Sequence, residues 1–240
     1  MRRRILDTLL AERAKGASLA LVTDLKTGQQ SLVYSDVAKG EFGLSDSQLA
    51  AVRTAIEADK SGIVDETLFV HVVNPAPRLF IVGAVHIAQA LAPLASLIGY
   101  AVTVIDPRRA FATDERFPAV TLVSDWPDEA MARTPPDRRT AIVTLTHDPK
   151  VDDPALVAAL RSPAFYIGAL GSKKTHGKRT ERLLAQGFTA PDIARIHGPV
   201  GMRIGAVTAS EIAASILAEL IAVRRLGKAA SPMADMKGAA

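Results

Sequence analysis

The 240-residue sequence contains no cysteine, which excludes disulfides, thiolate metal sites and cysteine nucleophiles. The same absence fits a reducing compartment. Aromatic residues make up only 5% of the sequence, with a single tryptophan, so alanine, valine, leucine and isoleucine must supply the core. A core built from these residues is typical of a parallel sheet covered by helices on both faces.

Long apolar runs are also missing, and no stretch approaches the roughly 18 apolar residues of a membrane span. Residues 1–4, Met-Arg-Arg-Arg, are typical of the start of a signal peptide, but Asp7 and Glu12 interrupt the apolar segment that would have to follow. We therefore expect a cytoplasmic protein without a membrane partner. The net charge of +4 comes from dispersed basic residues that aromatic residues rarely accompany, which argues against nucleic acid as a partner.

The hydrophobic pattern changes at residues 74–77, Asn-Pro-Ala-Pro, where we place a domain boundary because proline disfavours regular structure before it. Residues 1–74 predict a small N-terminal α/β region. Its expected elements are a helix over 1–16, strands over 18–23 and 30–34, a helix that starts at the capping box 45–48 and stops near Gly62, and a strand over 63–73.

Residues 76–226 alternate between expected strands and helices, which predicts right-handed βαβ units. The strands are expected at 78–83, 101–105, 119–123, 140–146 and 164–169. The helices are expected at 86–98, 126–132, 153–161, 173–186 and 208–226. The predicted fold class is therefore α/β, with a Rossmann-type parallel sheet in the order 3-2-1-4-5. Residues 227–240 are small and polar and predict a flexible tail.

The turn after the first of these strands, residues 81–88, is similar to the dinucleotide-binding pattern G-x-G-x-x-G/A. Asp106 ends the next strand, at the distance expected of a residue that binds a ribose hydroxyl. Val85 stands where the middle glycine should be, and its side chain should obstruct a pyrophosphate. The pattern leaves open whether the Rossmann scaffold binds a dinucleotide. The candidate residues are Gly83, Ala84, His86 and Asp106.

Residues 165–179, FYIGALGSKKTHGKR, combine an apolar strand, a glycine-rich turn, a hydroxyl and a basic helix start. Free N–H groups and the helix dipole favour anions such as phosphate at such a place. The alternative is a solvated, charged helix face. The candidate residues are Gly168, Gly171, Ser172, Lys173, Lys174, His176 and Arg179.

Two further loops contain candidate binding residues. His147 and Asp148 follow the fourth strand, at the sheet edge where α/β proteins bind ligands, and we expect Asp152 or Asp153 to cap the next helix. Residues 196–205 hold three glycines and a proline, which indicates a loop whose shape is needed; its candidates are His197, Gly198 and Gly201. The histidines lack a metal-ligand spacing and no G-x-S-x-G motif occurs, so we predict neither a metal site nor a catalytic residue.

Together these motifs resemble the xanthine dehydrogenase accessory (XdhC/CoxI) family over most of residues 76–225. The segments that carry the resemblance are PRLFIVGAVHIAQ, VTVIDPR, LTHDPKVDDPAL, YIGALGSKKTHGKR and IHGPVGMRIGAVTASEIAASILAELIAVR. The resemblance implies a Rossmann-type protein that binds molybdenum cofactor (molybdopterin) and helps its sulfuration and its insertion into a molybdenum hydroxylase. The client would be a xanthine, aldehyde or carbon monoxide dehydrogenase. The partners to consider besides the client are a sulfurating enzyme and a second copy of the chain.

The sequence departs from the family pattern in two places. Val85 replaces the second glycine of the family's G-A-G-H loop, and residues 1–73 lack the Gly-Ser-x-Pro and Gly-Gly-Cys-x-Glu segments of longer members. No role of that cysteine transfers to this chain, which we interpret as a short form that works beside a full-length one. The resemblance implies a cofactor-binding chaperone rather than a catalyst, with the cofactor's phosphate at the basic helix start.

Two alternative functions remain at this stage. One is an NAD(P)-dependent oxidoreductase in which His147 transfers a proton and Asp106 favours NAD over NADP. The other is an interaction module with a vestigial pocket.

Overall fold

The computed structural model of the chain describes residues 3–34 and 37–227. Contacts between residues divide the chain into two compact units, residues 1–75 and 76–240, and each is described by itself. Apart from Gly227, the expected flexible tail lies outside the described residues. No helix in the described ranges is long and apolar enough to cross a membrane.

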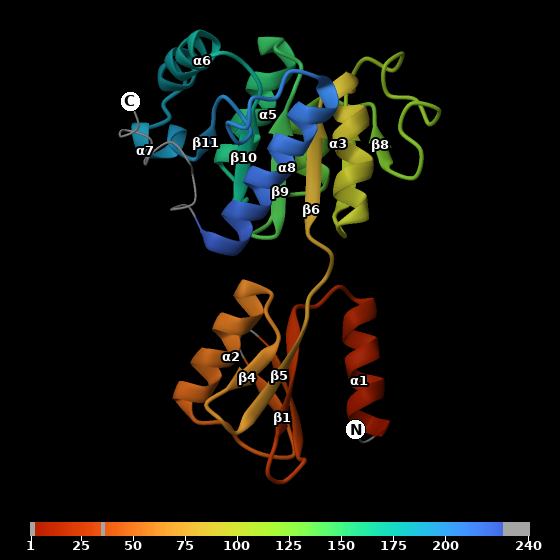
Figure 1. Cartoon of the computed structure of the whole chain (residues 1–240), viewed down its shortest axis with the longest axis vertical. Coiled ribbons are helices and arrows are strands. Elements are labelled where there is room, and N and C mark those ends of the chain that lie inside the picture. The colour runs from red at the N-terminus through yellow and green to blue at the C-terminus, as the bar shows by residue number, and fades with distance from the viewer. Residues whose placement is uncertain (1–2, 35–36, 228–240) are drawn as a thin grey trace. The chain divides into compact units, whose positions relative to one another are not determined.

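The described part of the N-terminal unit is an antiparallel sheet with a helix on each face (Figure 1). Its elements are α1 (Arg3–Ala14), β1 (Leu19–Asp24), β2 (Gln30–Tyr34), β3 (Ala38–Gly40), α2 (Asp46–Ala58), β4 (Gly62–Val64) and β5 (Leu68–Val73). The strands lie in the order β3-β2-β1-β5-β4. Side chains alternate between the faces of β1, so Ala20 packs with the α2 residue Val52 while Leu19 packs with the α1 residue Leu9.

The single strand expected over residues 63–73 is wrong, because β4 and β5 are two strands paired antiparallel across a tight turn. Asp65 and Glu66 adopt left-handed backbone conformations in that turn, with φ of 51° and 63°. The Thr67 hydroxyl donates a 2.6 Å hydrogen bond to the Asp65 carboxylate and so stabilises it. The turn contains no glycine or proline, the residues that usually mark a turn in a sequence, so it could not be recognised.

The C-terminal unit is a parallel sheet between helical layers (Figure 1). Its elements are β6 (Arg78–Val82), α3 (His86–Leu97), β7 (Ala101–Ile105), β8 (Thr121–Val123), α4 (Pro127–Arg133), β9 (Thr140–Thr144), α5 (Pro149–Leu160), β10 (Tyr166–Ala169), α6 (Lys173–Ala185), α7 (Ala190–Ile193), β11 (Ile196–His197) and α8 (Ala209–Leu226). The described strands lie in the order β11-β10-β9-β6-β7-β8 and pair in parallel.

The Rossmann-type α/β prediction is confirmed, and the sheet differs from the expected order 3-2-1-4-5 only by one added strand. Numbered within the unit, β6 to β10 follow the expected order, and β11 adds a sixth strand beside β10. This strand has two residues, Ile196 and His197, which is too short to produce a hydrophobic pattern in the sequence.

Alternating residues of β6 explain why the sheet is covered on both sides. Leu79 and Ile81 pack in the core beneath α3 and α8, whereas Phe80 and Val82 pack in the core beneath α4 and α5. Helix α6 differs from these four because its buried residues are only Arg179 and Leu183 among those described. It therefore presents a largely polar surface at the end of the sheet where the strands terminate (Figure 1).

Candidate functional site

The carboxyl ends of β6, β9, β10 and β11 meet at one edge of the sheet, because these strands are parallel neighbours. The loops that follow them touch one another in pairs. A Cβ built on Gly83 would lie 2.5 Å from the Thr146 methyl, and one built on Gly198 would lie 2.2 Å from His176 Nδ1. The loop after β6 therefore contacts the loop after β9, and the loop after β11 contacts α6.

The β6–α3 turn is tied to the end of β7 by Asp106, whose side chain is fully buried. This carboxylate accepts a 2.8 Å hydrogen bond from the Ala84 N–H and bonds of 2.9 and 2.7 Å from the Arg108 guanidinium. Burial raises the pKa of Asp106, but the hydrogen bonds from Arg108 and Ala84 outweigh it and hold the pKa below its ordinary value. The role expected of Asp106, binding a ribose hydroxyl, has no support here because both oxygens already serve the loop.

The loop after β9 is held by Asp152 in an unusual conformation. His147 has a left-handed backbone with φ of 61°, and its N–H donates to Asp152 Oδ2 at 3.1 Å. The Thr146 hydroxyl donates to Asp152 Oδ1 at 2.7 Å. A left-handed residue other than glycine costs free energy and persists only when its surroundings fix it. Here the buried carboxylate of Asp152 fixes it and leaves the His147 side chain exposed.

The cap predicted for α5 is wrong by several residues. Asp148 is the N-cap, since its side chain accepts the Lys150 N–H at 2.9 Å, and Pro149 occupies the first turn. Asp152 and Asp153 lie one turn inside the helix and are buried. Pro149 therefore marks the helix start, as expected for proline at the first helical position.

The first turn of α6 is closed by its own N-cap. The Ser172 hydroxyl accepts the Thr175 N–H at 3.1 Å, and Gly171 beside it has a φ of 147°. The Ser172 hydroxyl therefore serves the helix as its N-cap. Two of the cations predicted with it, Lys174 and Arg179, lie on the face of α6 that contacts the loop after β9.

A cavity of about 190 Å³ lies at this contact between α6 and the β9–α5 loop. Its described lining residues are His147, Pro149, Asp152, Lys174, Thr175, Lys178, Arg179 and Arg182. Four of these are cationic and one is a carboxylate. Asp153 binds the Arg182 guanidinium through two hydrogen bonds, of 2.5 and 2.9 Å, so Lys174, Lys178 and Arg179 give the cavity its positive charge.

Arg179 is the most unusual residue of the cavity, because its side chain is 2% exposed. Its Nη2 donates to the Leu170 carbonyl at 3.0 Å and lies 3.8 Å from Asp152 Oδ2. Its Nε and Nη1 are buried and have no hydrogen-bond partner among the described residues. Burial lowers the pKa of Arg179, yet arginine stays protonated in proteins. A buried donor without a partner costs about 1–3 kcal/mol, so Nε and Nη1 are candidate donors to an acceptor from outside the described residues.

A second polar network joins β10, β11 and α8 around Glu219, whose side chain is 6% exposed. This carboxylate accepts the Tyr166 hydroxyl at 2.6 Å and the Gly201 N–H at 2.9 Å, and lies 3.2 Å from His197 Nδ1. The Tyr166 and His197 rings stack with their centroids 4.7 Å apart. The network fixes the loop after β11 against α8.

Glu219 stays ionised in these surroundings. Burial raises the pKa of Glu219, but hydrogen bonds from His197, Tyr166 and the Gly201 N–H lower it overall below its ordinary value. Burial and the neighbouring charge raise the pKa of Tyr166 well above its usual range. Tyr166 and Glu219 were absent from the sequence-based candidates. The sequence pattern could have identified Glu219, because this residue lies seven positions after Ile212 and therefore on the apolar face of α8, where a carboxylate is unusual.

Several predicted site residues, Gly168 and His176 among them, do not line the cavity beside α6. A Cβ on Gly168 would lie 2.5 Å from Val200 Cγ2, so this glycine admits the loop after β11. His176 Nδ1 is buried against Gly198 without a hydrogen-bond partner among the described residues, and burial lowers the pKa of His176. His86 and Lys173 are exposed and do not line the cavity.

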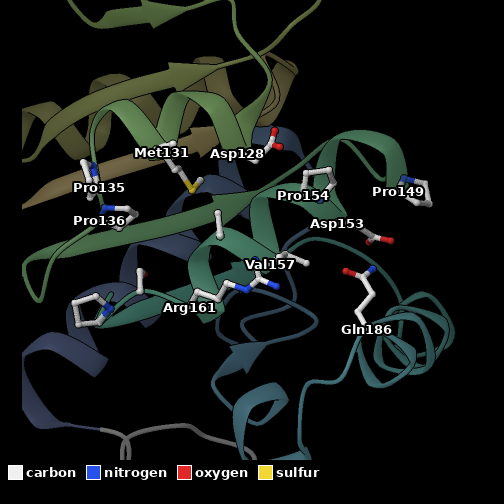
Figure 2. A pocket seen from close by; sticks show the side chains of 14 residues that line it. Asp128, Met131, Pro135, Pro136, Pro149, Asp153, Pro154, Val157, Arg161 and Gln186 are labelled. Carbon is white, nitrogen blue, oxygen red and sulfur yellow. The ribbon is translucent and has the colours of Figure 1, made fainter.

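A second, larger pocket of about 810 Å³ lies between α4 and α5 (Figure 2). Figure 2 shows Met131 of α4 and Val157 of α5 on its walls, with Gln186 at the end of α6. Of the candidate binding residues predicted from the sequence, none lines it. The smaller cationic cavity contains three of the predicted residues, His147, Lys174 and Arg179, so it is the better candidate site. Within the described ranges no group of three or more histidine, aspartate or glutamate side chains could hold a metal ion.

Comparisons with known proteins agree with this architecture. The family model described as the XdhC Rossmann domain matches residues 79–220. The chain is 33% identical over 190 residues to a probable xanthine dehydrogenase subunit of Bacillus subtilis, covering 78% of this chain and 56% of the relative. It is 36% identical over 151 residues to the molybdenum cofactor insertion chaperone PaoD of Escherichia coli, covering 63% of this chain and 41% of PaoD.

Two further matches extend the comparison. The protein YqeB of E. coli is 32% identical over 170 residues, which cover 71% of this chain and 31% of YqeB. A crystal structure described as a xanthine dehydrogenase from Bacillus halodurans superposes with a TM-score of 0.71 at 28% identity, covering 95% of this chain and 66% of that one. The chain spans between about a third and just over half of these curated relatives. Since the family model covers more than half of its residues, the chain belongs to the XdhC family.

Proposed function

We propose that the chain binds molybdenum cofactor and helps its insertion into a molybdenum hydroxylase, such as a xanthine dehydrogenase. The observation that carries the proposal is the cationic cavity beside α6 in a domain of the XdhC family, where two buried Arg179 donors have no hydrogen-bond partner among the described residues. The name of PaoD, a molybdenum cofactor insertion chaperone, supports the same role.

The described residues fit an anionic cofactor. Arg179 supplies buried donors that have no partner among the described residues, and the exposed Lys174 and Lys178 supply positive charge to the cavity. These three side chains would hold the phosphate that the cofactor's pterin carries. The bound cofactor supplies molybdenum chemistry to the client enzyme, while this chain binds the cofactor, shields it and releases it.

The finer parts of the proposal concern sulfuration and assembly. If the chain helps the sulfuration of the molybdenum, it must contact a sulfurating enzyme. A second copy of the chain, in a homodimer, is another partner to test. Xanthine, aldehyde and carbon monoxide dehydrogenases are the client classes to compare. We place the activity in the cytoplasm, which the absence of cysteine suits.

A cofactor-transfer assay tests the proposal. The purified chain, mixed with molybdenum cofactor and passed through a desalting column, should retain pterin and molybdenum and restore activity to a cofactor-free hydroxylase. Lys174→Glu with Lys178→Glu should reduce retention at least tenfold, because two charges at the cavity mouth are reversed. No retention by the wild-type chain would contradict the proposal. Binding of the hydroxylase without retention would favour an interaction module.

The oxidoreductase alternative predicts tight binding of NAD or NADP, and we expect none. The Ala84 N–H donates to Asp106 instead of facing a pyrophosphate, and Val85 occupies the position of the middle glycine. Calorimetric titration with NAD and with NADP should therefore give no saturable heat at micromolar protein. Saturable binding of NAD at micromolar concentrations would restore the alternative.

A further inference from the structure

We infer that the cavity between α6 and the β9–α5 loop is a subsite for a terminal phosphate monoester, in which Arg179 is the buried anchor and Lys174 and Lys178 are the outer cations. The inference deepens the proposed function and rests on it for the identity of the rest of the ligand. It concerns the chemical group that this cavity selects, whatever molecule carries that group.

The first argument is the bonding of the guanidinium. Nη2 is used by the Leu170 carbonyl, while Nε and Nη1 are enclosed without a partner among the described residues. Asp152 does not supply the missing acceptor, because its carboxylate lies 3.8 Å from Nη2 and forms no hydrogen bond with Nε or Nη1. An oxyanion in the cavity would receive charge-assisted hydrogen bonds, which are stronger than those between neutral groups.

The second argument is charge. Arg182 is neutralised by Asp153 at 2.5 and 2.9 Å, and Arg179 lies 3.8 Å from the Asp152 carboxylate. Lys174 and Lys178 are exposed lining residues that add two more positive charges. A phosphate monoester carries about −1.5 to −2 charges near pH 7, which matches this excess better than the single charge of a diester.

The third argument is size. A volume of about 190 Å³ is below the roughly 300–1,000 Å³ of pockets that enclose a whole small-molecule ligand. The cavity therefore encloses one group and leaves the body of the ligand outside. A terminal phosphate meets this requirement. An internal pyrophosphate does not, because the ligand continues on both sides of it and could not be enclosed at one end.

A titration with three probes on the full chain tests the inference: inorganic phosphate, methyl phosphate and dimethyl phosphate. Wild-type protein should bind the first two with millimolar dissociation constants and dimethyl phosphate at least tenfold more weakly. Arg179→Met, which replaces the guanidinium with an uncharged, unbranched side chain, should weaken methyl phosphate binding at least tenfold. Lys174→Met should weaken it about threefold. Lys173→Met is the matched control, because Lys173 has the same charge on the same turn but does not line the cavity.

The outcomes separate the subsite from general charge and from the proposed function. Equal weakening by Lys173→Met and Lys174→Met, or equal affinity for monoester and diester, would overturn the inference. If circular dichroism shows that Arg179→Met unfolds the domain, Lys174→Met with Lys178→Met decides the question. Phosphate binding without cofactor retention leaves the subsite standing and removes the proposed function. Cofactor retention that Arg179→Met does not change removes the subsite and leaves the function.

Discussion

Glu219→Ala should destabilise the C-terminal unit by about 3–5 kcal/mol, the range for removing one partner of a buried polar network. The Tyr166 hydroxyl and the Gly201 N–H both donate to this carboxylate and would lose their acceptor. In a domain of this size the loss corresponds to a fall of roughly 10 °C in the melting temperature. Thermal unfolding followed by circular dichroism measures it, and an unchanged melting temperature would contradict the network.

Glu219→Gln is the matched control, because its amide oxygen can still accept from Tyr166 and Gly201 while its NH₂ faces His197. We expect a cost below about 1 kcal/mol for this variant. The wild-type protein and Glu219→Gln should differ in how their stability changes at acidic pH. The pKa of Glu219 is held below its ordinary value of 4.5, so its contribution is present above that pH and is lost as the pH falls through the folded-state pKa. Glu219→Gln should lack this part of the acid dependence.

Most of the Rossmann-type unit could be predicted from the sequence because its strands and helices repeat their patterns over many residues. The helix from Ala209 to Leu226 was predicted within a residue by its capping box and its apolar stripe. The two-residue strand β11 and the turn at Asp65 were missed. Neither changes the hydrophobic period, and the turn lacks the glycine that usually marks a left-handed position.

The hydrogen-bond partners of the candidate site residues could not be predicted, because the sequence shows which residues are near a sheet edge but not what they contact there. Ser172 and Asp106 were expected to face a ligand, yet their oxygens accept hydrogen bonds from the Thr175 N–H and from Arg108. Asp152 was expected as a cap and instead fixes the loop at His147. Arg179 was predicted as one cation among several, while its burial depends on how α6 packs.

Asp152→Ala should destabilise the C-terminal unit by about 3 kcal/mol, because Thr146 and His147 would lose a shared acceptor and the buried Arg179 its nearby charge. Asp152→Asn should cost about 1 kcal/mol, since its amide keeps one oxygen acceptor. Burial raises the pKa of Asp152 above 3.8, so the stability linked to its proton is present below that pH and is lost as the pH rises through the folded-state pKa. Asparagine does not ionise and should lose less stability over that interval. Unfolding in urea at several pH values measures these differences.

Asp152→Asn should bind phosphate more tightly than the wild-type protein, even though the variant is less stable. Removing the carboxylate 3.8 Å from Arg179 Nη2 raises the positive charge of the cavity, and we expect the affinity for methyl phosphate to rise about threefold to tenfold in Asp152→Asn. Asp148→Asn is the control: asparagine caps a helix as well as aspartate does, and Asp148 does not line the cavity. Weaker binding in Asp152→Asn would mean that the shape of the loop after β9, rather than the charge around Arg179, decides which anions enter.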